Sequence, residues 1–225
     1  MSERRLLAID TSGTNALVAL GAADGTLITE RRWLAGYRHG EELLTRIDEM
    51  LTTTGTPMAE IGGIVVGTGP GAFTGLRVGL ATAKALARGL GVPIAGVPTS
   101  EALLEAASLA GAFEGTQAVL LLPAGPSDRV VVAGGLARLV RGGDELEVEP
   151  GSVIIAVDLP GRAPADALTL GAQAETGLSA ALLRLGAERL VQGGDDVARL
   201  VPEYVTLPRG VPAMKGEVRW LRDRR

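Results

Sequence analysis

The stretch that decides the fold is GTGPGAFTGLR, residues 67–77, a glycine-rich loop between an apolar run and an alanine-rich segment. The run before it, GGIVVG at residues 62–67, has the continuous apolar pattern of a strand buried on both faces. The loop lacks the Gly-Lys-Ser/Thr ending of a Walker A sequence and the spacing of a Rossmann fingerprint. Its glycines therefore leave two interpretations open: they cradle an anion at the N-terminus of the next helix, or they let two pieces of backbone pack closely. These glycines are Gly67, Gly69, Gly71 and Gly75.

The segment after the loop, residues 75–90, predicts a helix that is packed on two sides. One face is apolar and consists of Leu76, Leu80, Ala83, Ala87 and Leu90. The roughly opposite face carries small residues, namely Val78, Thr82, Ala85 and Gly89. We expect the apolar face to meet the helix's own sheet and the small-residue face to meet a second subunit. Between the faces lies a basic stripe that is either solvated or in contact with an acidic partner, formed by Arg77, Lys84 and Arg88.

The chain on either side of this region is organised as two similar halves. Residues 6–34 alternate strand-like runs with turns, residues 39–55 predict an amphipathic helix, and residues 92–111 predict a strand and a helix. A second series begins at residue 117, with strand-like runs at 117–122, 129–140 and 152–157 and one or two helices at 174–194. We interpret this as a duplicated βββαβα arrangement, the α/β plan of actin-like, ribonuclease H-like ATPase folds. The predicted lobes are residues 1–110 and 111–225, and packing of the C-terminal tail back onto the first lobe stays an open alternative.

Two turns occupy the places where actin-like proteins bind phosphate. In the first, DTSGTN at residues 10–15, Asp10, Thr11 and Ser12 follow a strand and can hold a metal-bound water or offer N–H groups to phosphate. The same residue types also form plain hairpin turns, so both interpretations stand. The second turn, PAGPSD at residues 123–128, contains two prolines, each of which lacks an N–H donor. This second turn argues against ATP hydrolysis.

Composition limits the chemistry that the chain can perform. The 225 residues include no cysteine and one histidine, His39, so neither a thiolate site nor an ordinary zinc site is expected, and we identify no catalytic residue. Aromatic residues make up 3% and the net charge is −4, which argues against a large nucleic-acid surface. The N-terminus lacks a signal-peptide pattern, and no run approaches the length of a membrane span. We expect a cytoplasmic protein that binds no metal and no membrane.

Four segments together resemble the TsaB (YeaZ) family of bacterial threonylcarbamoyladenosine-biosynthesis proteins. They are LLAIDTS (6–12), RHGEELL with IDEML (38–51), IGGIVVGTGPGAFTGLRVGLATAKALA (61–87) and GVPTSEAL (96–103), in the family's order and spacing. The resemblance is close from Leu6 to Leu104 and returns near LVPEYV at residues 200–205. It implies an actin-like fold in a non-catalytic relative of the transferase subunit TsaD. It also favours close helix approach over phosphate binding as the reason for the glycine loop.

The resemblance further implies partners. Family members dimerise with a TsaD-like transferase and also form homodimers. With a TsaE-like ATPase, the complex transfers threonylcarbamoyl to the adenosine beside the anticodon of tRNAs that read codons beginning with A. The contact uses two helices, which begin near Gly40 and Gly75 in this chain, and tRNA is met only through the complex. The interface residues expected from this are Leu43, Leu44, Ile47, Leu51, Gly75, Val78, Thr82 and Ala85.

No cofactor is expected, but ATP or ADP at the partner interface is left open. The candidate nucleotide or phosphate residues are Asp10, Thr11, Ser12, Gly69 and Gly71. One departure from the family lies at Pro123 to Asp128, where an Asp-Ala-Arg run is missing, and the role of that hairpin is left open. An actin-like ATPase or small-molecule kinase stays as an alternative, although the proline-containing turn argues against it. A peptidase of the M22 type is a third interpretation, and it needs metal ligands that the sequence does not show.

Overall fold

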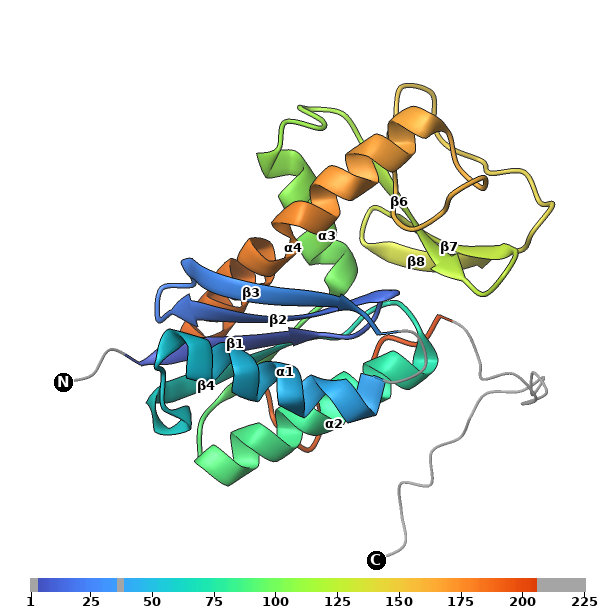
Figure 1. The fold of residues 1–225 in the computed structure, drawn as a ribbon. Helices are drawn as coiled ribbons and strands as arrows, with labels where there is room; N and C mark the ends of the chain where they lie inside the picture. The colour runs from blue at the N-terminus through green and yellow to red at the C-terminus, as the bar shows by residue number, and fades with distance from the viewer. Residues whose placement is uncertain (1–3, 36–38, 206–225) are drawn as a thin grey trace, which may run out of the picture.

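The computed structural model describes residues 4–35 and 39–205, which form two β-sheets joined by a long helix (Figure 1). The side chains of residues 39–41 lie outside the description as well, and His39 is among them.

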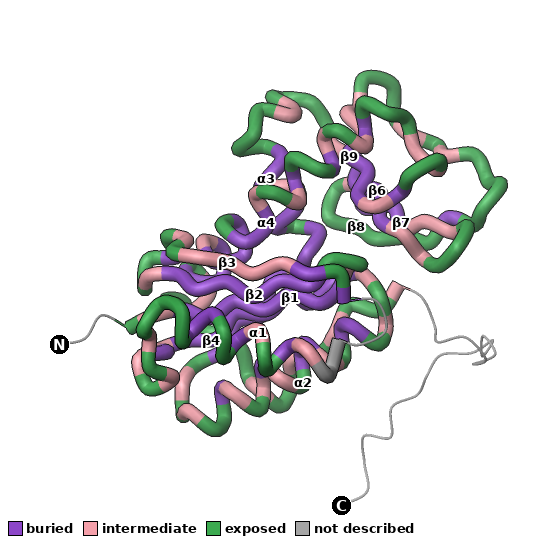
Figure 2. Tube along the Cα trace, viewed as in Figure 1, coloured by how far each residue is buried: buried purple, intermediate pink, exposed green. Residues whose placement is uncertain are grey.

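The first sheet has the strand order β3-β2-β1-β4-β5. β1 (Arg5–Asp10), β2 (Asn15–Ala22) and β3 (Leu27–Leu34) pair antiparallel, whereas β4 (Ile61–Gly67) and β5 (Ile94–Val97) run parallel to β1. A short 3-10 helix, Met58–Glu60, precedes β4. Helices α1 (His39–Thr54) and α2 (Phe73–Leu90) cover one face of the sheet, and α3 (Thr99–Leu109) and α4 (Ala165–Val191) cover the other (Figure 1). Figure 2 shows that the central strands are buried along most of their length, as their continuous apolar runs predict.

The second sheet repeats the strand arrangement of the first but not its helices. Its order is β8-β7-β6-β9. β6 (Ala118–Ala124) pairs antiparallel with β7 (Asp128–Ala133) and parallel with β9 (Val153–Ala156), while β7 pairs antiparallel with β8 (Leu136–Val140). β6 thus takes the position that β1 takes in the first sheet.

The prediction of a full βββαβα repeat is wrong for the second half. The described residues 141–152, RGGDELEVEPGS, form turns and extended loop without a helix. Their two apolar residues, Leu146 and Val148, stand two positions apart, so they cannot supply the three- and four-residue spacing of a helix face. Both pack instead against the small apolar core of the second sheet.

The helix α4 spans 27 residues and packs against both sheets. Gly186 lies against Val65 of β4, and Gly171 lies against the carbonyl oxygen of Ala156 in β9. A Cβ atom at either glycine would overlap these neighbours, so the close approach of α4 to each sheet needs a glycine there. Because α4 belongs to both halves, the division of the chain between residues 110 and 111 stays a prediction.

The segment after α4, residues 195–203, runs back beside the first sheet. The Asp195 N–H donates to the Ile94 carbonyl oxygen of β5 at 2.8 Å, and Val197 and Leu200 pack against the core under α1 and α2. In the part of the chain that the structure describes, no helix is both long enough and apolar enough to cross a membrane.

Candidate partner-binding face and the glycine loop beside it

The helix α2 has the two different faces that its sequence predicts. Leu76, Leu80, Ala83 and Ala87 are buried against the first sheet. On the opposite side, Thr82 is half-buried, Ala85 and Gly89 are exposed, and Val78 is half-buried and packs against the core of the first sheet. The helix ends at Gly91, whose left-handed φ of 65° suits a glycine C-cap. The described chain therefore covers one side of α2 and leaves the small-residue side largely open.

The interface prediction for α1 needs a correction. Leu43 and Ile47 are 1% exposed and Leu51 is 5% exposed, because these side chains pack against the first sheet as part of its core. They cannot add contact area to a partner. Leu44 points the other way and is 58% exposed. The apolar sector of α1 was correctly predicted, but it is occupied by the chain's own sheet.

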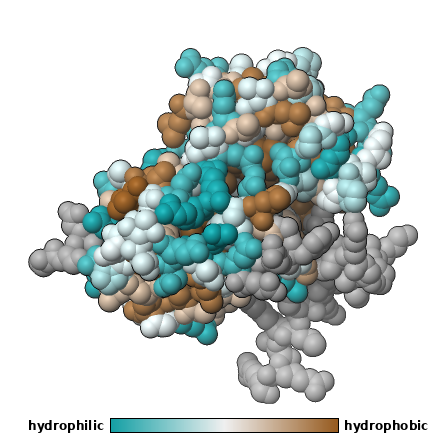
Figure 3. All heavy atoms as spheres, viewed as in Figure 1, coloured by the Kyte–Doolittle hydropathy of each residue, from teal (hydrophilic) through white to brown (hydrophobic). Residues whose placement is uncertain are grey.

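The outward faces of α1 and α2 lie side by side on the same side of the sheet (Figure 1). Figure 3 shows brown and tan surface along the lower edge of the molecule, over these two helices, where small and aliphatic residues gather. Among the predicted interface residues, Leu44, Val78, Thr82 and Ala85 contribute to this side, whereas Gly75 is buried at the beginning of α2. We call the side formed by Leu44, Val78, Thr82, Ala85 and Gly89 the helix face.

The turn after β1 is held by a buried hydrogen-bond network around Asp10. One carboxylate oxygen accepts from the Ser12 N–H at 2.8 Å and the Ser12 hydroxyl at 2.7 Å, and the other accepts from the Thr99 hydroxyl at 2.6 Å. Asp10, Thr11 and Ser12 are each less than 5% exposed. Burial raises the pKa of the Asp10 carboxyl, and the hydrogen bonds from Thr99 and Ser12 act in the opposite direction. Both donors of Ser12 are thus engaged within the chain.

The glycine loop packs directly on that turn. A Cβ atom at Gly67 would overlap the Asp10 carboxylate, and one at Gly71 would overlap the Ser12 carbonyl group. The Ala72 N–H donates to the Ser12 carbonyl oxygen at 2.7 Å, and the Thr11 hydroxyl donates to the Gly75 carbonyl oxygen at 2.7 Å. Close approach of two backbone segments therefore accounts for these glycines without any ligand.

Gly69 has a separate reason to be glycine, because its φ of 100° is strained for other residues. Its N–H donates to the Thr99 hydroxyl at 3.1 Å, so it joins the same network. Thr99 links the network to α3, and sequence reasoning missed it because it comes 89 residues after Asp10. The structure brings together all five predicted phosphate residues. Ser12 donates to Asp10, Thr11 donates to Gly75, Gly69 donates to Thr99, and Gly71 packs against the Ser12 carbonyl group.

The second hairpin turn has a different chemistry. The guanidinium group of Arg162 donates to the carbonyl oxygens of Gly125, Pro126 and Asp128 at 2.9, 3.2 and 3.3 Å. A phosphate loop presents N–H groups, whereas this turn presents carbonyl oxygens to a cation. Sequence reasoning identified the two prolines but not Arg162, since an arginine 34 residues away carries no local signal.

Polar contacts also connect the two halves near the first turn. The Thr14 hydroxyl donates to the Asp158 carboxylate. On β3, Arg32 donates to the carbonyl oxygen of Thr176 at 3.0 Å and to the Ser179 hydroxyl at 3.2 Å, both on α4. These contacts fix the meander β1-β2-β3 against α4.

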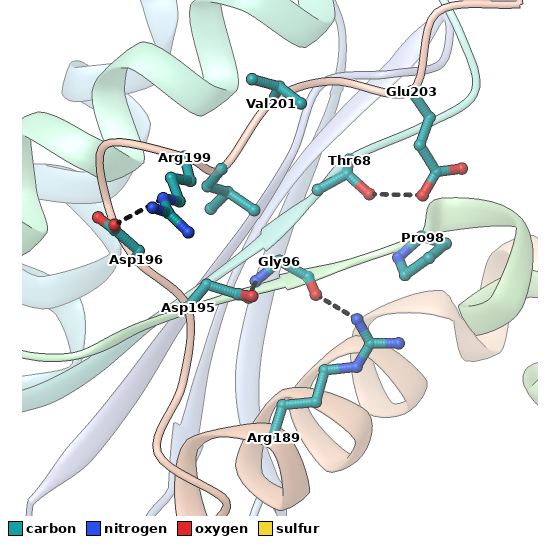
Figure 4. A pocket seen from close by; sticks show the side chains of 10 residues that line it. Thr68, Gly96, Pro98, Arg189, Asp195, Asp196, Arg199, Val201 and Glu203 are labelled. Atoms are coloured by element: carbon teal, nitrogen blue, oxygen red, sulfur yellow. Dashed lines mark hydrogen bonds and ion pairs between the residues drawn. The ribbon is translucent and has the colours of Figure 1, made fainter.

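A hollow of about 390 Å³ lies between β5, the end of α4 and residues 195–203 (Figure 4). Its charged side chains are engaged with the chain: the Gly96 N–H donates to Asp195 at 2.7 Å, Arg189 donates to the Gly96 carbonyl oxygen at 2.5 Å, and Thr68 donates to Glu203 at 3.2 Å. Burial raises the pKa of the Glu203 carboxyl. The hollow thus shows how the C-terminal segment is attached, and two further lining residues, Asp196 and Arg199, form an exposed ion pair at 3.6 Å. Within the described residues, no three or more His, Cys, Asp or Glu side chains are grouped as a metal site requires.

The chain is similar to proteins of tRNA modification. The family model described as TsaD, tRNA N6-adenosine threonylcarbamoyltransferase, matches residues 33–163. The tRNA threonylcarbamoyladenosine biosynthesis protein TsaB of Escherichia coli (strain K12) is 40% identical over 95 residues, which cover 42% of this chain and 40% of that protein. The protein of the same name in Haemophilus influenzae is 37% identical over 108 residues, 48% of this chain and 44% of that protein. The chain therefore aligns with less than half the length of these relatives.

One solved structure is similar over a longer range. YeaZ from Pseudomonas aeruginosa matches with a TM-score of 0.65 and 22% identity, and the match covers 89% of this chain and 99% of that one. This likeness confirms the predicted two-lobe, actin-like α/β fold.

Proposed function

This chain belongs to the TsaB (YeaZ) family, and from that premise we propose that it is a non-catalytic subunit of a complex that modifies tRNA. The complex transfers a threonylcarbamoyl group to the adenosine adjacent to the anticodon of tRNAs that read codons starting with A. The chain acts in the cytoplasm by dimerising with a TsaD-like transferase subunit. A TsaE-like ATPase joins the complex, and tRNA is reached through the complex. In the absence of the transferase the chain pairs with itself.

The observation that carries this proposal is the helix face, which residues 4–35 and 39–205 leave largely open. Side chains as small as those of Thr82, Ala85 and Gly89 let a second helix come close, since interaxial distance depends on the side chains at the contact. Leu44 is an exposed leucine beside them and offers apolar area to a partner. Packing against the sheet requires only one apolar side of α2. It therefore does not explain why the opposite side carries small and weakly polar residues instead of charged ones.

The contacts of the two turns favour a scaffold role for the chain and argue against an ATPase or small-molecule kinase activity. The N–H and the hydroxyl of Ser12 donate to Asp10 within the first turn, and the Thr11 hydroxyl donates to the Gly75 carbonyl oxygen of α2. The second turn directs carbonyl oxygens toward Arg162. A triphosphate between the lobes would have to displace both sets of contacts, each of which is worth about 1 kcal/mol or more per hydrogen bond.

The test is reconstitution from purified components. The chain, its TsaD-like and TsaE-like partners, tRNA and the small substrates are mixed, and threonylcarbamoyl transfer is measured with and without the chain. We expect a stable one-to-one complex with the TsaD-like subunit, transfer that depends on the chain, and no ATP hydrolysis by the chain alone. ATP hydrolysis by the isolated chain that is lost in Asp10→Asn, with the fold retained, would instead support the kinase-like alternative.

A further inference from the structure

Arg77 packs over the Phe73 ring and beside the Tyr204 ring at the start of α2. Its guanidinium carbon lies 3.9 Å from the centre of the Phe73 ring and 5.9 Å from the centre of the Tyr204 ring. Its Nε donates to the Tyr204 hydroxyl at 3.0 Å, and the two ring centres are 5.0 Å apart. Phe73 and Arg77 are one helical turn apart, so α2 itself builds half of the stack, while Tyr204 arrives from 127 residues later.

Tyr204 is placed by the C-terminal segment that lies against the first sheet. The Glu203 N–H donates to the Thr68 carbonyl oxygen at 2.8 Å, and the Thr68 hydroxyl donates to the Glu203 carboxylate at 3.2 Å (Figure 4). Leu200 fills the space above Gly96, where a Cβ atom would overlap it. The aromatic ring is therefore delivered to Arg77 by a segment with several contacts of its own.

The two terminal nitrogens of Arg77 have no partner in residues 4–35 and 39–205. The hydrogen bond to Tyr204 uses only Nε, and Arg77 forms no ion pair with a described residue. Further along the same stripe, Lys84 and Arg88 also lack an ion pair within the described chain. A guanidinium group that is fixed at Nε and free at both terminal nitrogens presents the planar fork that binds a carboxylate in two places.

We propose that Arg77 is the charged anchor of the partner contact, and that its two terminal nitrogens receive a carboxylate from the TsaD-like subunit. This inference rests on the proposed function. It adds that the partner supplies a carboxylate at the end of the helix face where α2 begins. The stack holds the side chain in its binding geometry before the partner arrives, which lowers the entropy cost of association. Tyr204 is a positioning residue, because it acts on the partner through Arg77.

A protein carboxylate suits this position better than an RNA phosphate. The next outward positions of α2 are Val78, Thr82 and Ala85, which are small and uncharged and form a surface for a helix. The chain as a whole has a net charge of −4, and a nucleic-acid surface needs a wider basic footprint.

The test measures affinity for the purified TsaD-like subunit by calorimetry at two salt concentrations, with thermal melting as the check on folding. Arg77→Ala is expected to weaken binding about thirtyfold and to reduce its salt dependence. Arg77→Lys keeps the charge but loses the fork, so we expect about a tenfold loss. Tyr204→Phe keeps the ring and loses only the hydrogen bond to Nε, so its loss is expected to be about threefold. Arg138→Ala, an exposed arginine on β8, is the matched control and is expected to bind as the wild type does.

A double variant tests whether Tyr204 acts on the partner through Arg77 or makes an independent contact with it. The double variant Arg77→Ala/Tyr204→Ala should bind no more weakly than Arg77→Ala, since Tyr204 acts through Arg77. Wild-type binding by Arg77→Ala, alongside loss of binding by Ala85→Trp, would overturn the anchor and leave the proposed function standing. Weaker binding of tRNA, but not of the TsaD-like subunit, by Arg77→Ala would also overturn it. If the wild-type chain does not bind the TsaD-like subunit at all, the proposed function fails and the anchor fails with it.

Discussion

The hydroxyl of Thr99 donates to the carboxylate of Asp10 at 2.6 Å and joins residues that are 89 positions apart. The same hydroxyl accepts from the Gly69 N–H at 3.1 Å. A single buried threonine therefore connects the first turn, the glycine loop and the beginning of α3. Through this contact the glycine loop holds the first turn and α3 together. The position of α2, which follows the loop, depends on it.

Replacing Asp10 should therefore lower stability more than it affects the partner. In Asp10→Ala, the Ser12 and Thr99 donors lose a buried acceptor, and we expect the free energy of unfolding to fall by about 2–4 kcal/mol. Partner affinity per folded molecule should stay near the wild-type value, because Asp10 is buried at the end of β1 and is not part of the helix face. Urea unfolding and calorimetry measure the two quantities, and Asp24→Ala, at an exposed turn, is the matched control. A loss of affinity at unchanged stability would show that the turn contacts the partner.

Two glycines of α2 should respond in opposite ways to the same substitution. A Cβ atom at Gly79 would overlap the Thr11 hydroxyl, so Gly79→Ala should destabilise the protein by about 1–3 kcal/mol. At Gly89 a Cβ atom meets nothing within 4 Å, and Gly89→Ala should stabilise the helix by about 0.5–1 kcal/mol. Chemical unfolding of both variants tests this, and equal effects would mean that α2 does not sit tightly on the turn.

A bulky side chain on the helix face should disrupt the complex and spare the fold. Ala85→Trp lies on the exposed side of α2, where substitutions usually change stability by about 0.5 kcal/mol or less. At a packed interface the same ring clashes, and we expect a loss of affinity of about thirtyfold. Ala172→Trp, at an exposed position of α4, is the control. Affinity that survives while the melting temperature collapses would mean that Ala85 faces the core of the chain.

Glu203 should give the protein a pH dependence of opposite sign to that of an ion-paired carboxylate. Burial raises its folded-state pKa, while the Thr68 hydrogen bond and the charge of Arg189 lower it and the charge of Glu101 raises it. The folded state then binds a proton more readily than the unfolded state. Its contribution to stability therefore increases as pH falls from neutral through the raised pKa.

The variant Glu203→Gln isolates this effect, because its amide oxygen can still accept from Thr68 and does not titrate. Urea unfolding at a series of pH values from neutral to mildly acidic should show the wild type gaining stability relative to Glu203→Gln as the pH falls. Glu149→Gln, at an exposed loop position, should run parallel to the wild type. A difference between wild type and Glu203→Gln that stays constant with pH would refute the assignment.

The sequence by itself determined which residues share a side of each element. The three- and four-residue spacing of Leu76, Leu80 and Ala83 placed them on one side of α2, and the structure buries all three. In the same way, the continuous apolar run of β4 predicted a strand covered on both faces. These features depend on backbone geometry that repeats along the chain, so a local pattern is enough to reveal them.

Only the tertiary structure decided what each side meets. Leu43 and Ile47 shared a face as predicted, yet periodicity could not tell the chain's own sheet from a partner. Nor could it reveal that Thr99 completes the network of Asp10, or that Tyr204 pins Arg77, because contacts over 89 and 127 residues depend on how the whole chain packs. Hydrogen bonds and ring contacts form between atoms that folding brings together. Residues far apart in the sequence show no periodic pattern that would predict such a contact.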